Sequence, residues 1–155
     1  MSGAVTGSGT TAEDLSALPP AVAKGLAAWH HMVATQEMDD VESLIRPDAS
    51  FSSPAYWKPY QGSAAVAHVL QTALSVFSDF TYHRQFATDD GRSVTLEFSA
   101  KVGDLELKGV DLIAYDENGL IERFEVMIRP LKSLTALAEA MKARVDVSLL
   151  GKAPG

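Results

Sequence analysis

The feature that most constrains the fold is a change in the spacing of hydrophobic residues near residue 80. Before it, apolar residues recur every three or four positions, as on one face of an amphipathic helix. After it, they alternate with polar residues, as in a strand with one buried face. Turn signals at Asp89–Gly91, Gly103–Asp104 and Asn118–Gly119 divide this second part into four segments. The order predicts helices followed by an antiparallel meander, which is an α+β fold.

Three helical stripes precede the change and one follows it. The first helix opens at Pro19-Pro20, a shorter second helix stops at Pro47, and Ser63 is the expected N-cap of the third. The four stripes are Val22, Leu26, Trp29 and Val33; Met38, Val41, Leu44 and Ile45; Val66, Leu70, Ala73 and Phe77; and Leu134, Leu137, Ala138 and Met141.

The predicted strands are residues 80–86, 92–102, 105–115 and 120–128, and one face of their sheet must be buried against the helices. We expect one domain over residues 20–145. Residues 1–19 are rich in Gly, Ser, Thr and Ala and predict a loose lead-in, and residues 146–155 predict a loose tail.

Charge and cysteine content exclude several classes of protein. The 155 residues contain no cysteine, which excludes disulfide scaffolds and thiolate zinc sites. The net charge of -7 argues against nucleic acid or an anionic membrane as the partner. The first residues lack the basic and apolar regions of a signal peptide, so we expect a cytoplasmic protein.

One residue breaks the alternation of the third strand. Its odd positions are apolar or glycine except for Asp111, which therefore lies in an inward-pointing row. A buried carboxylate costs several kcal/mol unless it is paired, hydrogen-bonded or protonated. Asp111 is therefore retained for a structural pair or for chemistry, and burial should raise its pKa into the range of a hydrogen-bond donor or general acid/base.

Three interpretations of Asp111 stay open at this point. It can be a functional carboxyl, or it can form a buried ion pair with Arg84, which shares the parity of Tyr82 on the first strand. A bulge at Gly109 would instead turn Asp111 to the outside of the sheet.

The segment Gly109–Ile121 resembles the penultimate-strand hairpin of the nuclear transport factor 2-like superfamily, which includes ketosteroid isomerase, SnoaL-type polyketide cyclases and limonene epoxide hydrolase. The resemblance extends to Leu44–Phe51 and to Gly62, and it covers most of residues 21–130. It implies a cone-shaped, curved antiparallel sheet wrapped by helices, a cystatin-like α+β barrel, with an apolar pocket at the open end.

The resemblance also assigns roles to single residues. Asp111 falls where ketosteroid isomerases place the protonated aspartic acid of their oxyanion hole. Trp29 corresponds to the tyrosine that partners that acid, and Ser53 stands at the position of the general base. Serine cannot do that carboxylate's work of moving a proton, so we do not expect an authentic ketosteroid isomerase.

The four histidines show no metal-ligand spacing, and we expect neither a metal nor a cofactor. His30 flanks the first helical stripe, where it is either a packing residue or the base that Ser53 is not. The loop Pro54–Tyr60 holds three aromatic residues and suits a lid for a flat ligand, a hydrophobic plug or a dimer contact.

We therefore predict a protein that binds a small apolar or polycyclic molecule and isomerises or cyclises it, with Asp111 and His30 as catalytic candidates. The expected binding residues are Trp29, Tyr56, Trp57, Tyr82, Phe98 and Arg84. Glu97, Glu122 and Glu125 have outward parity, so a homodimer through the outer sheet face is expected. The rival hypothesis is a non-catalytic binding or dimerisation module in which Asp111 forms only a structural pair.

Overall fold

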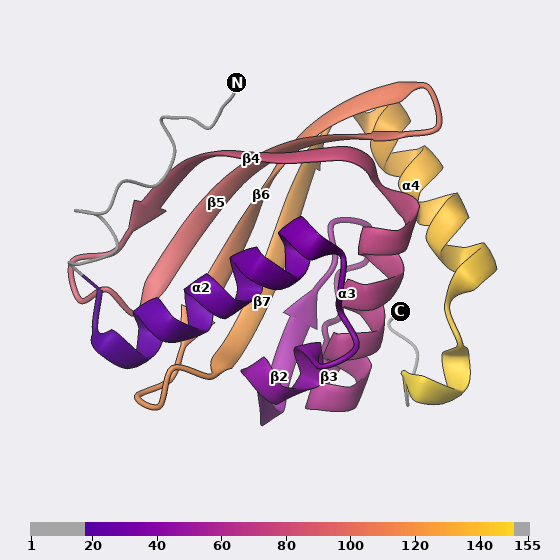
Figure 1. Ribbon diagram of the computed structural model, residues 1–155. Helices are drawn as coiled ribbons and strands as arrows, with labels where there is room; N and C mark the ends of the chain where they lie inside the picture. The colour runs from indigo at the N-terminus through magenta and orange to yellow at the C-terminus, as the bar shows by residue number, and fades with distance from the viewer. Residues whose placement is uncertain (1–17, 151–155) are drawn as a thin grey trace.

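The computed structural model describes residues 18–150, and its elements confirm the α+β class (Figure 1). The helices are α2 (Pro20–Thr35), α3 (Ser63–Val76) and α4 (Leu131–Arg144), with short 3-10 helices η1 (Val41–Leu44) and η2 (Val147–Leu149). The strands are β2 (Ile45–Ser52), β3 (Tyr60–Gln61), β4 (Ser78–Ala87), β5 (Ser93–Val102), β6 (Leu105–Tyr115) and β7 (Ile121–Arg129).

The strands form a single six-stranded sheet in the order β3-β2-β7-β6-β5-β4. The expected meander is present as β4 to β7, with each neighbouring pair antiparallel. The expectation of a wholly antiparallel sheet is wrong, because β2 runs parallel to β7. The sheet is mixed and open, with β3 and β4 at its two edges.

The predicted second helix, which carries the stripe from Met38 to Ile45, is wrong except for one 3-10 turn. Only Val41–Leu44 is helical, as a 3-10 turn, and β2 begins at Ile45. The burial of Ile45, Ala49 and Phe51 belongs to a strand, whose register shifts between Ile45 and Ser50. Pro47 lies within that shift, where a residue without a backbone N–H is tolerated in a strand.

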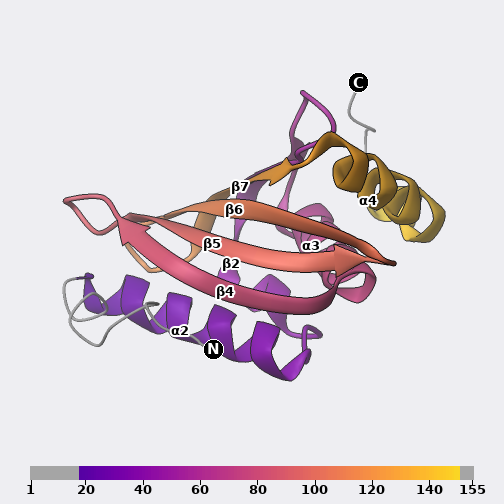
Figure 2. The same cartoon turned by 90° about the horizontal axis from the view of Figure 1, so that it is seen from above.

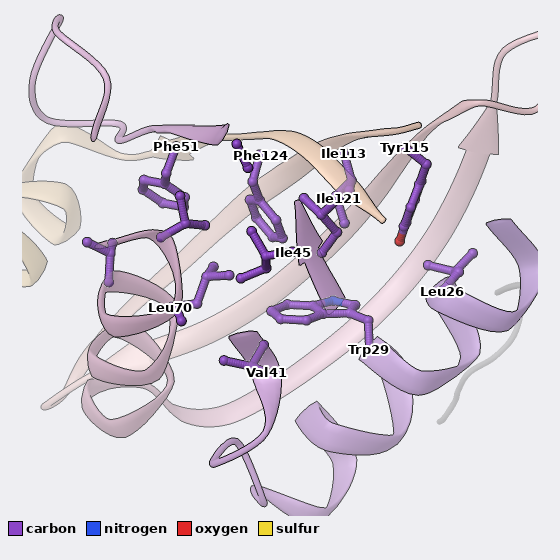
Figure 3. Close-up of a cluster of buried hydrophobic side chains, with 14 of the residues drawn as sticks. Leu26, Trp29, Val41, Ile45, Phe51, Leu70, Ile113, Tyr115, Ile121 and Phe124 are labelled. Atoms are coloured by element: carbon purple, nitrogen blue, oxygen red, sulfur yellow. The ribbon is translucent and has the colours of Figure 1, made fainter. Parts of the chain in front are cut away.

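The helices cover one face of a curved sheet. Figure 2 shows α2 lying across the concave side, with α4 at one end of the strands. Trp29 points from α2 toward Ile121 and Phe124 of β7 (Figure 3), and its ring lies 5.3 Å from that of Phe124 in an edge-on arrangement. A second apolar cluster, around Phe98 and Leu137, lies beneath α4.

Gly109 on β6 allows the aromatic wall to approach the sheet. A Cβ atom at this position would lie 2.6 Å from the Met127 carbonyl oxygen and 2.6 Å from the Phe98 ring. Real Cβ atoms do not come so close, so Phe98 occupies space that any larger residue at position 109 would need.

The ends of the described chain pack against the domain. Leu18 and Leu150 are both buried, and η2 lies within the segment expected to be a loose tail. The rest of the expected lead-in and tail, residues 1–17 and 151–155, lies outside the described residues. Within residues 18–150, no helix is both long enough and apolar enough to cross a membrane.

Gly109→Ala should destabilise the protein by roughly 1–3 kcal/mol, because the new methyl group meets backbone and an aromatic ring rather than a flexible side-chain end. Urea unfolding measures the change. Thr95→Ala, on the outer face of the neighbouring strand, is the control and should change stability by no more than about 0.5 kcal/mol. Equal stability of Gly109→Ala and wild type would contradict this account of the packing.

Candidate functional site

A cavity of about 300 Å³ lies between the concave face of the sheet, α3 and α4. This volume is at the lower end of the range for small-molecule sites, roughly 300–1,000 Å³. The residues that line it are almost all apolar, and they come from both hydrophobic clusters. Among the described lining residues, Asp111 is the only carboxylate.

Asp111 lies in the middle of β6 and points to the concave side, with 5% of its surface exposed. The pairing of β6 with β5 runs without interruption from Ser93–Ala114 to Val102–Leu105. The alternative of a bulge at Gly109 is therefore wrong. Regular alternation along β6 is therefore enough to place this carboxyl in the cavity wall.

Asp111 has one hydrogen-bond partner among the described residues. The Tyr82 hydroxyl donates to Asp111 Oδ2 at 2.6 Å, and the Trp29 indole Nε1–H donates to the Tyr82 oxygen at 2.9 Å. The three side chains come from α2, β4 and β6, and all three line the cavity. They form a continuous polar chain in apolar surroundings.

Burial dominates the protonation of this site. It raises the pKa of Asp111 to about 7, against the opposing effect of the hydrogen bond from Tyr82, which favours the ionised form. Burial and the nearby Asp111 also raise the pKa of Tyr82 well above its usual value, so Tyr82 keeps its proton. Asp111 is thus the group that titrates near neutral pH.

Arg84 does not pair with Asp111, so that expectation is wrong. The register of β4 against β5 shifts between Tyr82–Phe98 and Gln85–Leu96, so two residues of β4 oppose Glu97 alone. Such a bulge reverses the facing of the residues beyond it. Arg84 consequently lies on the outer face of the sheet.

On that outer face, Arg84 binds Glu97 through two hydrogen bonds of 2.7 and 2.8 Å. The Lys108 ammonium lies 3.1 Å from the same carboxylate. These cations, Arg84 first, lower the pKa of Glu97 to about 2. The cluster is a charged patch on the outside of the sheet, separate from the cavity.

His30 is not among the residues that line the cavity. Its Nε2 lies 3.2 Å from the Gln85 side-chain oxygen, and its ring packs edge-on against Tyr82 with centroids 5.1 Å apart. Burial lowers the pKa of His30, so the ring is neutral near pH 7. His30 therefore packs against the Tyr82 ring and does not line the cavity.

The aromatic loop contributes unequally. Tyr56 lines the cavity, whereas the Trp57 side chain is 94% exposed and is not a lining residue. Ser53 also lines the cavity, and its hydroxyl oxygen accepts hydrogen bonds from the backbone N–H groups of Ala55 and Tyr56. Phe98 forms a wall, with its ring stacked on that of Phe80 at 4.9 Å.

Helix α4 contributes to the site, which its sequence does not predict. Its apolar stripe contributes to the cavity wall, and Lys142 of the same helix is a further lining residue. The stripe was visible in the sequence, but its packing partner was not. Within residues 18–150, no three acidic or histidine side chains are grouped as metal ligands.

A family model and several solved structures are similar to this chain. Residues 26–124, more than half of the chain, match the model of the SnoaL-like domain. A structure described as a steroid delta-isomerase from Pseudomonas aeruginosa is 50% identical, with a TM-score of 0.81, over 82% of this chain and 93% of that chain. No significant match is found among curated proteins.

A protein described as having a cystatin-like fold, from Silicibacter pomeroyi, is 41% identical, with a TM-score of 0.73, over 77% of this chain and 84% of that one. A nuclear transport factor 2-like protein from Mesorhizobium loti shares the fold at 13% identity, with a TM-score of 0.63, over 71% of this chain and 92% of that one. On this similarity and on the matched domain, the chain belongs to the SnoaL-like domain family.

Proposed function

We propose that this protein binds an apolar, fused-ring molecule through one carbonyl oxygen and isomerises it by proton transfer, with Asp111 as the polar centre. The observation that carries the proposal is a single carboxyl, with a pKa of about 7, in the wall of an otherwise apolar cavity. Apolar pockets with few, well-placed polar groups are typical of small-molecule sites.

Asp111 serves the two halves of such a reaction in its two protonation states. The ionised form takes a proton from a ligand carbon next to the carbonyl and leaves an enolate. The carboxyl, now neutral, donates a hydrogen bond to the enolate oxygen and then gives its proton to another carbon, which restores the carboxylate. A pKa near the working pH suits a group that must do both. The 50% identity to the chain described as a steroid delta-isomerase supports the same chemistry.

A binding-only function is the second candidate. Ser53 stands at the position of the isomerases' general base, and its oxygen is already engaged by two backbone N–H groups. No histidine and no second carboxylate lies among the described lining residues. In this candidate Asp111 holds the ligand and transfers no proton.

Binding is tested with β-tetralone, a bicyclic ketone, and tetralin, the matching hydrocarbon. Wild type should bind the ketone about threefold to tenfold more tightly, which is the net value of one neutral hydrogen bond. Asp111→Leu keeps the branched shape of the side chain but removes the donor, so it should bind the two compounds equally. Calorimetric titration measures the affinities, and circular dichroism checks the fold.

The same ketone separates the two candidates. In deuterium oxide, proton transfer exchanges the hydrogens next to the carbonyl, which NMR detects. Faster exchange with wild type than with Asp111→Leu supports isomerisation, and exchange at the rate of free ketone in both supports binding alone. A wild type that binds neither compound would contradict the proposed function.

The raised pKa of Asp111 makes a prediction about stability. The carboxyl is protonated in the folded protein but ionised in the unfolded chain between about pH 4 and pH 7. Its contribution is therefore complete below about pH 4 and is lost as the pH rises toward 7. Relative to Asp111→Asn, wild type should lose about 1.4 kcal/mol per pH unit over this window, or on the order of 4 kcal/mol in total.

Urea unfolding of both proteins at several pH values tests this. Comparing the two removes the effects of His30 and Glu97, whose pKa values also shift on folding but in the opposite direction. A free-energy difference that does not change between pH 5 and pH 8 would mean that Asp111 is ionised in the folded state.

We also propose that a second copy of this chain covers the outer sheet face. Met127, which is 52% exposed, pairs across the strands with half-buried Val110, and Leu112 lies on the same face. No described helix covers this face, and the charged cluster around Glu97 borders the apolar strip. An apolar centre with a polar rim is the usual anatomy of an interface.

Met127→Lys should convert a wild-type dimer into a monomer, because the new charge of each copy would be buried in the apolar centre of the interface. Sedimentation velocity measures the mass. Glu106→Lys, an exposed substitution at the end of β6, is the control and should leave the dimer intact. A monomeric wild type would rule out this interface.

A further inference from the structure

We propose that Trp29 and Tyr82 are positioning residues that fix the orientation of Asp111, so that Oδ2 is always an acceptor for Tyr82 and Oδ1 alone meets the ligand. The effect on ligand binding rests on the proposed function. The arrangement of the three side chains can be tested in the protein without a ligand.

The Trp29 indole determines the direction of the hydrogen-bond chain. An indole N–H can only donate, so the Tyr82 oxygen is the acceptor in the 2.9 Å contact with Trp29. A phenol has a single hydrogen. That hydrogen lies along the 2.6 Å contact to Asp111 Oδ2, and the polarity of the whole chain follows from the tryptophan.

The opposite direction, in which Asp111 donates a hydrogen bond to Tyr82, is excluded. If neutral Asp111 donated to Tyr82, the tyrosine hydrogen would need another acceptor. The indole cannot accept it, and Tyr82 has no other hydrogen-bond partner among residues 18–150. Oδ2 therefore accepts in both protonation states, and the proton of the neutral acid is on Oδ1. A hydrogen bond received by the phenol also polarises its own O–H, which strengthens the bond to Asp111.

Aromatic packing holds the Trp29 and Tyr82 rings in place. Trp29 is 1% exposed and is held edge-on against Phe124. The Tyr82 ring is held between edge-on contacts to Phe80 at 4.9 Å and to His30 at 5.1 Å. His30 is in turn attached to Gln85. Neither ring can rotate away without disrupting this packing, so the hydroxyl stays on Oδ2.

Among residues 18–150, no histidine and no second carboxylate lies on the cavity wall beside Asp111. His30 packs on Tyr82 from α2, and burial lowers its pKa further below 7. The described lining residues of α3, β5 and β7 are all apolar. The remaining ionisable groups near Asp111 or on the cavity wall are Tyr115 of β6, Tyr60 of β3, Tyr56 of the loop and Lys142 of α4.

The orientation has a consequence for Asp111→Asn. Tyr82 would donate to the amide oxygen, which places the NH₂ group toward the ligand as a permanent donor. The variant should then bind β-tetralone with the same affinity at pH 5.5 and pH 8.5. Wild type should bind it about threefold to tenfold more weakly at the higher pH, because a carboxyl with a pKa of about 7 is then almost fully ionised and its hydrogen bond to the ketone is lost.

The decisive test is the titration of the Asp111 carboxyl by carbon-13 NMR in the free protein. Tyr82→Phe removes the donor that favours the ionised form, so the midpoint should rise by about one pH unit. Trp29→Phe should raise it by a smaller amount, through the weakened Tyr82 hydroxyl. In the Tyr82→Phe background, Trp29→Phe should have no further effect, since Trp29 acts through Tyr82.

Tyr60→Phe is the matched control, because Tyr60 lines the same cavity without a bond to Asp111. It should leave the midpoint unchanged. A merely structural role for Trp29 and Tyr82 would lower the melting temperature but leave the midpoint in place, and that result would overturn the proposal. Loss of the preference for β-tetralone over tetralin in Asp111→Asn as complete as in Asp111→Leu would overturn it as well. Failure of wild type to bind any ketone would contradict only the proposed function.

Discussion

The burial of one carboxyl on the apolar face of the sheet is the constraint on which the site depends. Asp111 lies in a cavity wall whose other described members are nearly all apolar, and its hydrogen bond from Tyr82 is neutral rather than ionic. One such bond does not replace the hydration that a carboxylate loses. The group therefore keeps its proton until the pH approaches 7, and an acidic residue becomes a hydrogen-bond donor.

The two faces of the sheet show how environment sets the behaviour of a carboxyl. Glu97 on the outer face has two cations within hydrogen-bond distance, and its pKa falls to about 2. On the inner face, no cation of residues 18–150 pairs with Asp111, and burial raises its pKa to about 7. The bulge in β4 keeps them apart, because it turns Arg84 outward to Glu97 while Tyr82 stays inward on Asp111.

Alternation along a single strand was enough to place Asp111, since β6 pairs with β5 without interruption. It failed for Arg84 because a bulge leaves no mark in the residue pattern. The whole of β2 was also missed, because Pro47 resembles a helix stop when the partner strand is unknown. The Tyr82–Asp111 bond depends on the register of three strands, which no local pattern contains.

The family resemblance placed Trp29 beside Asp111 as a donor, and the structure inserts Tyr82 between them. The arrangement of these residues therefore differs from the one that the family resemblance implies. The indole N–H is engaged by the Tyr82 oxygen, and the Tyr82 hydroxyl is engaged by Asp111 Oδ2, so Oδ1 is the polar atom of the three side chains that is left for a ligand. The fold supplies the cavity, and the hydrogen-bond chain determines how the only carboxyl in its described lining is presented.

The most direct test is a crystal structure with β-tetralone bound at a pH below 6. We expect the ketone oxygen within hydrogen-bond distance of Asp111 Oδ1, with the Tyr82 hydroxyl still on Oδ2. A ketone that lies in the cavity with its oxygen turned toward Lys142, or a Tyr82 hydroxyl that has left Asp111 for the ligand, would contradict it.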